Sequence, residues 1–311
     1  MNFYRTSIEM RQNYDRAVSN FGDEDPSKDG TTEKDKVFPT AFITARCFAE
    51  QTNIPNAKEL YASFCEQMGF VKGENEPDQI DTPHFMELRY LSSEKVIKEA
   101  AEKGEVDQVV ELASGFTPHS VNLLTTEGGI KNYIENDFAV NLDVKKEAVN
   151  NFIGGIPVAF VPGNAVEAAT WERIDAQLAD SPVAIFCEGL MMYLSREQQI
   201  EFLNNIKSIL KKRGGFFMHE DILKYHPELK ENPRFARITN KLKAISSNTA
   251  LDESFTQESV TKFYEELGFV VERVPEDVPL SIDSYPEHTR ENARELQTAG
   301  FQMWKLSLPK E

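Results

Sequence analysis

Side chains able to form hydrogen bonds follow five short apolar runs in the middle of the chain. They are Glu111 in the first run, Glu135 and Asp137 ending the second, Asn164 after the third, Glu188 after the fourth, and His219, Glu220 and Asp221 ending the fifth. Ligands of open parallel sheets bind where the carboxyl ends of the strands meet, so we expect these groups to form a site. Asp137, 22 residues after Gly115, is placed to accept hydrogen bonds from both hydroxyls of a ribose.

The turn after the first run is built from residues with little or no side chain. It reads Ala113-Ser114-Gly115, and such residues matter where the backbone must approach a ligand closely. A dinucleotide pyrophosphate is typically bound by a GxGxxG turn, whereas this turn has one glycine. The turn is better suited to a ligand without phosphates, such as S-adenosylmethionine. A dinucleotide-dependent oxidoreductase is therefore the less favoured alternative.

Several further residues have two interpretations each. His219 can act as a general base for a hydroxyl acceptor, or it can be a core histidine that bonds to the backbone. Met191 and Tyr193, shortly after Glu188, can line a substrate pocket or belong to the core. Arg89 lies in an amphipathic helical pattern, where an arginine more often forms a surface ion pair.

The elements that must position these groups alternate along the chain. The apolar runs "DQVVELA", "KNYIEND", "IPVAFVPG", "SPVAIFCEG" and "GGFFMHED" are separated by helical patterns at about 117–127, 141–153, 167–179 and 195–212. Near-continuous apolar strands with helices between them are typical of a parallel sheet covered on both faces. Two later strand candidates, "FVVERV" and "FQMWKLSL", predict an antiparallel edge. The predicted fold class is α/β with a Rossmann-like sheet.

Two regions are expected on either side of Gly104. Residues 1–104 are predicted to form a helical cap, and residues 105–311 an α/β domain. The polar, acidic segment 19–36 is predicted to be a mobile loop within the cap, and a helical insert is expected at about 222–255. Three phenylalanines at helical spacing are expected in the core of the cap: Phe42, Phe48 and Phe64.

Composition excludes several classes of function. A net charge of −17 repels phosphate backbones, so we expect no nucleic-acid partner. No apolar run of about 18 residues is present and the N-terminus is charged, which predicts neither a membrane span nor a secretory signal. The scattered cysteines, Cys47, Cys65 and Cys187, are expected to be buried free thiols of a cytoplasmic protein. The five histidines show no zinc-ligand spacing, so we expect no metal.

Five motifs in register resemble those of a known family. They are "ELRYLSSEKVI", "VVELASGFTPHSVNLL", "KNYIENDFAVNLDVKK", "FVPGNAVE" and "AIFCEGLMMYLSREQ". Together they resemble the leucine carboxyl methyltransferase superfamily, in its branch of bacterial O-methyltransferases of the polyketide-tailoring type. The N-terminal "FPTAFITARCFAEQT" is similar to a helix of that branch.

The resemblance implies the class I methyltransferase fold, a seven-stranded Rossmann-like sheet with a helical N-terminal cap, and S-adenosylmethionine as cofactor. It places Arg89 on the cofactor carboxylate, with Arg46 as a looser candidate, and Ala113 and Gly115 in the turn of close approach. It places Asp137 on the ribose, and Asn164 and Ala165 on the adenine. Glu188 would face the methionine ammonium, and Glu111 would also favour the cationic part.

The family pattern is not matched everywhere. Ala113 replaces a glycine, Thr117 and His119 stand near the places of an acid and an arginine, and Asn164 replaces an aspartate. A homologue that binds the cofactor but catalyses weakly is therefore an alternative. Otherwise the acceptor is expected to be a small or medium-sized molecule with a carboxylate, which requires no base, or a hydroxyl, for which His219 is the candidate. The sequence indicates no particular oligomeric state.

Overall fold

A computed structural model of the chain describes residues 33–68, 83–125, 129–153, 158–222, 257–275, 277–285, 287, 290 and 301–310. Among these residues, no helix is both long and apolar enough to cross a membrane.

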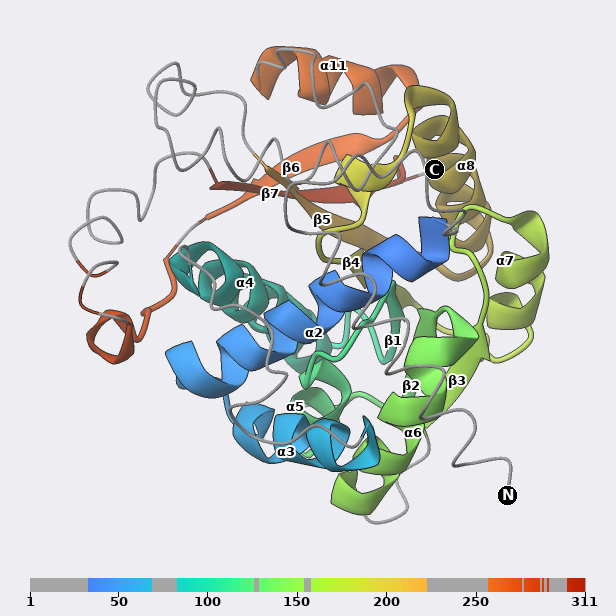
Figure 1. Cartoon of the computed structure of the whole chain (residues 1–311). Helices are drawn as coiled ribbons and strands as arrows, with labels where there is room; N and C mark the ends of the chain where they lie inside the picture. The colour runs from blue at the N-terminus through green and yellow to red at the C-terminus, as the bar shows by residue number, and fades with distance from the viewer. Residues whose placement is uncertain are drawn as a thin grey trace.

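A seven-stranded sheet forms the centre of the molecule (Figure 1). Its strands are β1 (Gln108–Leu112), β2 (Asn132–Asp137), β3 (Val158–Pro162), β4 (Val183–Cys187), β5 (Gly215–Ile222), β6 (Val270–Val274) and β7 (Phe301–Ser307). Their order is β3-β2-β1-β4-β5-β7-β6. The first five strands are parallel, and β7 is antiparallel to both β5 and β6. The predicted parallel sheet and its antiparallel edge are therefore confirmed.

The strand register brings four chain segments to the same level. Leu112, the last residue of β1, is paired with Asn136 of β2 and with Cys187 of β4. Cys187 is in turn paired with His219 of β5. The residues just beyond these positions thus meet at one edge of the sheet, which we call the strand edge.

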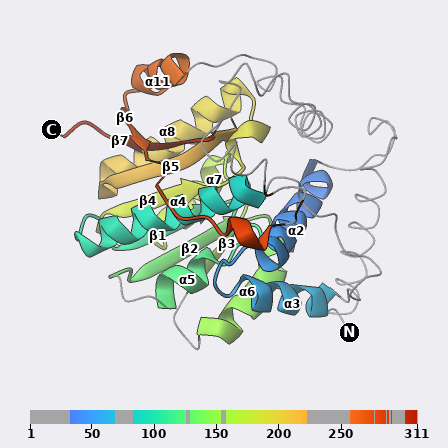
Figure 2. The same ribbon diagram turned by 90° about the vertical axis from the view of Figure 1, so that its left-hand side faces the viewer.

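Helices cover both faces of the sheet (Figures 1 and 2). On one face lie α4 (Pro83–Glu102), α5 (His119–Thr125) and α6 (Ala139–Ile153), and on the other α7 (Ala168–Asp175), α8 (Arg196–Arg213) and α11 (Gln257–Glu266). Local sequence fixes the helix ends, as α8 illustrates. Ser195 and Gln198 form a capping box at its start, and Gly214 ends it at φ +76° after a basic last turn.

The N-terminal helices α2 (Glu33–Gln51) and α3 (Ala57–Met68) pack against the side of the sheet covered by α5 and α6. Figures 1 and 2 show α2 passing across the end of the sheet that carries the strand edge. The ring of Phe42 contacts those of Tyr61 and Phe116. Phe42, Phe48 and Phe64 are fully buried, so their predicted place in the core is confirmed.

The predicted loop at 19–36 and the predicted insert at 222–255 overlap the described residues only in part. Residues 33–36 belong to α2 and not to the mobile loop predicted for 19–36. Glu and Lys are good helix formers, so a charged segment without apolar residues can still extend a helix. The rest of that loop and the helical insert predicted at 222–255 lie outside the described residues, apart from Ile222, which ends β5. All three cysteines are free, with Cys65 half-buried and the other two buried.

Candidate functional site

The turn after β1 has an unusual backbone for its sequence. Ala113 lies at φ +51° and Gly115 at φ +47°, both in the left-handed region that favours glycine. For an L-residue such as Ala113 that conformation costs about 1–2 kcal/mol. A Cβ on Gly115 would lie 3.3 Å from the Cβ of Ala41 on α2. The turn therefore keeps the shape of the expected glycine turn, with α2 packed closely against it.

Asp137 joins the end of β2 to this turn. Its Oδ2 accepts a hydrogen bond from the Gly115 amide at 2.7 Å, and its Oδ1 accepts from the Phe138 amide and from Asn141 at 2.6 and 2.8 Å. Burial raises the pKa of Asp137, and the bonds from Gly115 and Phe138 oppose that rise. A carboxylate has about four acceptor positions, so Oδ2 can accept one more donor.

A fully buried lysine supports the turn from below. Lys145 on α6 lies 2.8 Å from Glu135 Oε2 and donates to the Ser114 carbonyl oxygen at 3.1 Å. Ser114 also donates its hydroxyl to Glu135. Burial acts to lower the pKa of Lys145, but Glu111 and Glu135 outweigh it and leave that pKa raised. The turn is thus fixed from α6, whose first half lies within the motif "KNYIENDFAVNLDVKK".

Glu111 belongs to this support and does not reach the strand edge. Its Oε1 accepts from Thr117 at 2.5 Å and its Oε2 from Tyr133 at 2.7 Å. Burial raises its pKa, while Lys145 acts in the opposite direction. The predicted contact of Glu111 with a cationic ligand stays a prediction.

Arg89 on α4 connects the ends of β4 and β5. Its Nε donates to Glu188 Oε2 at 3.1 Å and its Nη1 donates to Glu220 Oε1 at 3.2 Å. The Arg89 side chain is only 9% exposed, so this is a buried ion-pair triad and not the surface pair that a helical pattern suggests. Because a guanidinium carries five N–H groups, three remain beyond these two bonds.

Glu188 is held from three sides. Besides Arg89, Ser93 donates to its Oε1 at 2.6 Å and His119 Nε2 lies 3.1 Å from the same oxygen. Burial acts to raise the pKa of Glu188, but His119 and Arg89 bring it down to about 2. Glu188 is therefore a permanently charged group whose two oxygens already have partners.

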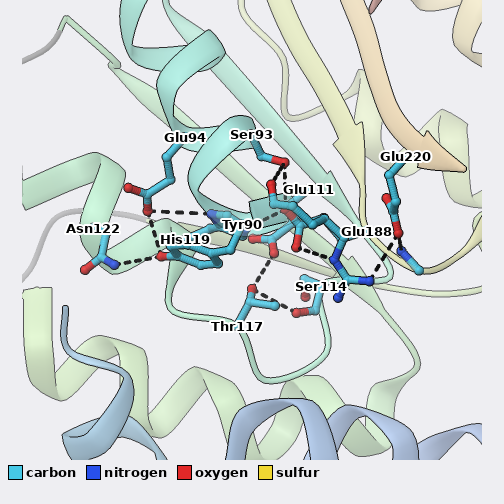
Figure 3. A network of polar contacts seen from close by, with 12 residues as sticks. Tyr90, Ser93, Glu94, Glu111, Ser114, Thr117, His119, Asn122, Glu188 and Glu220 are labelled. Carbon is cyan, nitrogen blue, oxygen red and sulfur yellow. Dashed lines mark hydrogen bonds and ion pairs between the residues drawn. The ribbon is translucent and has the colours of Figure 1, made fainter. Parts of the chain in front are cut away.

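His119 on α5 is fully buried and carries a positive charge at neutral pH. Its ring stacks on Tyr90 with centroids 3.9 Å apart, and its Nδ1 lies 3.6 Å from Glu94. Burial acts to lower its pKa, but Glu188 outweighs this and raises the pKa to about 9. The imidazolium thus lies beside Glu188 as a second cation next to Arg89 (Figure 3).

Glu220 at the end of β5 is the least satisfied acid of the group. Its Oε1 accepts from the Gly189 amide and from Arg89, while its Oε2 is buried with no hydrogen-bond partner among the described residues. Burial raises its pKa to about 7, against the opposing effect of Arg89.

His219, the predicted base, faces the other side of the sheet. Its Nε2 accepts from the Tyr264 hydroxyl at 2.7 Å, its Nδ1 donates to the Glu220 carbonyl oxygen at 3.2 Å, and its ring stacks on Phe217. This is the environment of the alternative interpretation, a core histidine. Side chains alternate along a strand, so the residue directed toward Arg89 is its neighbour Glu220.

The remaining predicted residues are distributed around the edge. Asn164 Oδ1 accepts from the Val166 amide at 3.1 Å, and the Ala165 carbonyl accepts from Trp171, so both shape the turn after β3. Met191 and Tyr193 form the short helix η2 (Met191–Tyr193) after β4, where Met191 is buried in the core. Tyr193 bonds to Thr40 of α2 and lies near Arg89.

Arg46, the looser candidate for the carboxylate, pairs with Glu50 one turn along α2 at 2.9 Å. Sequence reasoning missed Ser93, Glu94 and Lys145. Ser93 follows Arg89 by four residues on α4, so helical periodicity was a signal for it. Lys145 lies within the quoted motif "KNYIENDFAVNLDVKK", but its type and spacing did not indicate that it would reach the turn after β1.

The sequence matches the model of a known protein family. The family model described as leucine carboxyl methyltransferase matches residues 34–207, more than half of the chain. Among the curated proteins, none matches the sequence.

Solved structures share the fold. A candidate methyltransferase from Thermobifida fusca YX is similar over 87% of this chain and 94% of its own, at a TM-score of 0.56 and 11% identity. A DUF574 family protein from Streptomyces avermitilis MA-4680 is similar over 87% and 97%, at a TM-score of 0.54 and 12% identity. At such low identity, these likenesses concern the fold alone.

Proposed function

Because the chain belongs to the leucine carboxyl methyltransferase family, as the sequence predicted, we propose that it transfers a methyl group from S-adenosylmethionine to an oxygen of a small or medium-sized molecule. The observation that supports this most is the junction at the strand edge. There Asp137 binds the amide of Gly115, and the Arg89–Glu188 pair lies at the end of the neighbouring β4.

The residues present fit the cofactor. Asp137 has an acceptor position left for a ribose hydroxyl, and Arg89 has N–H groups left for a carboxylate. Asn164 offers its NH₂ to a ring nitrogen of the adenine, since its Oδ1 is engaged with Val166. The methyl group of S-adenosylmethionine is already activated by its sulfonium.

The work left to the chain is positioning and exclusion of water. Lys145 and Asp137 fix the turn over which the cofactor would lie, and α2 covers that turn through Ala41. The contact between Tyr193 and Thr40 joins the β4 side of the edge to the same helix. An acceptor entering between these groups would be shielded from bulk water.

The net charge of the chain limits the class of partner. The net charge of −17 disfavours nucleic acid, and the proposed acceptor carries a carboxylate or a hydroxyl. We place the reaction in the cytoplasm, since all three cysteines, which lie within the described residues, are free thiols.

Calorimetric titration with S-adenosylmethionine, S-adenosylhomocysteine and NAD tests the proposal. We expect the first two to bind and NAD not to bind. Asp137→Ala should weaken binding about tenfold to a hundredfold, because a hydrogen bond to a charged group contributes about 1.5–3 kcal/mol.

The matched control is Asp143→Ala, which removes an exposed aspartate of α6, the helix that follows β2, and should leave affinity unchanged. Binding of NAD in place of S-adenosylmethionine, or equal affinity in a folded Asp137→Ala variant, would contradict the proposed site.

A further inference from the structure

The strand edge contains a carboxylate with a free oxygen on the side away from the predicted ribose and adenine contacts. Arg89 reaches from Glu188 on β4 to Glu220 on β5, and the two acids differ in their bonding. Both oxygens of Glu188 have partners, whereas Glu220 Oε2 has none among the described residues. A buried acceptor without a hydrogen-bond partner costs free energy. A ligand that donates a hydrogen bond to Oε2 would remove this cost, which favours its binding.

The backbone beside Glu220 is shaped for close approach. Gly189 donates its amide to Glu220 Oε1 and lies at φ +71°. A Cβ at this position would lie 3.2 Å from Arg89 Nη1 and 3.9 Å from Glu220 Oε1. A side chain here would therefore crowd Arg89, and glycine leaves the Arg89–Glu220 pair undisturbed.

A second buried acid with an unpaired oxygen does not share this position. Glu135 Oε1 also lacks a partner, but Glu135 is completely enclosed beneath the turn by the ion pair with Lys145. Glu220 is slightly exposed and lies at the end of a strand. Of the two, Glu220 lies next to Arg89, the predicted contact of the cofactor carboxylate, whereas Glu135 lies next to Lys145.

The charges around Glu220 set when it is ionised. Arg89 from α4 favours the ionised form, while burial and the charge of Glu188 oppose it, which raises the pKa of Glu220 to about 7. Tyr193 from η2 also faces this group. A general base is most effective when its pKa lies near the working pH.

We propose that Glu220 is the general base of the methyl transfer and that the acceptor group is a hydroxyl. This inference rests on the proposed function and narrows its acceptor class. The acceptor oxygen forms a bond to the methyl carbon as the carbon–sulfur bond of the sulfonium breaks and its electron pair passes to sulfur. The hydroxyl proton passes to Glu220 Oε2. A carboxylate acceptor has no proton to give, and an ionised Glu220 would repel it.

Methyl transfer to two panels of acceptors, one of phenols and alcohols and one of carboxylic acids, tests this inference. The hydroxyl panel should be methylated, with kcat/KM rising about tenfold per pH unit up to pH about 7 and then levelling off. Glu220→Gln should lose about a hundredfold or more and its pH dependence, while its affinity for S-adenosylhomocysteine changes less than threefold. The matched control is Glu87→Gln, a buried acid of α4 bonded to Ser281 and Tyr285, which should keep the pH profile.

Preference for carboxylic acids, a rate that falls as the pH rises through 7, or a Glu220→Gln variant with normal turnover would overturn the inference. So would a wild-type protein that binds the cofactor and methylates neither panel. Failure of the wild type to bind the cofactor would instead refute the proposed function.

A readout without cofactor covers the case of a poorly folded variant. Glu220 in the folded state holds its proton more tightly than an ordinary glutamic acid, so wild-type stability should fall relative to Glu220→Gln as the pH rises from about 4.5 to 7. Glu220→Asp, which keeps the acid but shortens the side chain, should retain part of this dependence. Parallel curves for wild type and both variants would show that Glu220 does not titrate near neutral pH, and the inference would fall.

Discussion

The two halves of the strand edge hold buried charge in different ways. At the ends of β1 and β2, Lys145 lies beneath the turn with Glu111 and Glu135, and the same cation binds the turn's backbone. At the ends of β4 and β5, Arg89 is shared between Glu188 and Glu220, and one oxygen is left without a partner.

The difference has a physical consequence. An enclosed ion pair that also bonds to the backbone fixes a conformation, because every rearrangement would expose an unpaired charge to a low dielectric. A cation shared between two acids leaves one of them close to neutrality and able to exchange a proton near pH 7. The first half therefore suits the binding of a rigid cofactor, and the second suits chemistry on an acceptor.

The largest expected effect comes from removing the cation of the first half. Lys145→Met leaves Glu111 and Glu135 buried without compensation, which should cost about 3–5 kcal/mol of the free energy of unfolding. Denaturant unfolding measures this. The control is Lys146→Met at the exposed neighbouring position, which should change stability by less than about 0.5 kcal/mol. A small loss in Lys145→Met would mean that the two halves do not differ as described.

The next effect concerns the support of Glu188 in the second half. The pKa of His119 is raised from 6.5 to about 9, so its stabilising charge is fully present below pH about 6.5 and is lost as the pH rises through about 9. We expect the free energy of unfolding to fall over that range by an amount on the order of 3 kcal/mol, relative to His119→Gln. His84→Gln serves as control, since the pKa of His84 is about 4 and it does not titrate there. If the free energy of unfolding depends on pH in the same way for the wild type and for His119→Gln, the charge of His119 does not stabilise the protein.

The smallest effect tests the strain in the first half. Ala113→Gly relieves a left-handed conformation worth about 1–2 kcal/mol but adds about 0.4–1 kcal/mol of unfolded-state entropy, so stability should rise by about 0.5–1 kcal/mol. Ala165→Gly, which relieves no such strain, should lower stability by a similar amount. Thermal unfolding without ligand compares the two. Destabilisation in both variants would mean that the turn tolerates alanine at no cost.

Much of the fold was predictable from local patterns. The run "SPVAIFCEG" matches β4, and the helical pattern at about 195–212 matches α8 (Arg196–Arg213). The antiparallel pair at the edge of the sheet followed from two strand patterns without a helix between them. The start of α2 was not predicted correctly, because the charged residues 33–36 carry no apolar pattern. The two-part domain division and the cofactor contacts of Asp137 and Asn164 stay predictions.

Position along the chain is enough to predict that Asp137, Glu188 and Glu220 lie at the strand edge, because the carboxyl ends of parallel strands meet there. How these acids are paired depends on contacts between elements that are distant in the sequence. Arg89 meets Glu220, 131 residues away, and Lys145 meets the Ser114 carbonyl from a different element. Side chains alternate along β5, so Glu220 and His219 point to opposite faces of the sheet. The packing of Tyr264 against His219 and of Arg89 against Glu220 decides which of the two can meet a ligand. Such pairings depend on distances between elements, which sequence spacing does not encode.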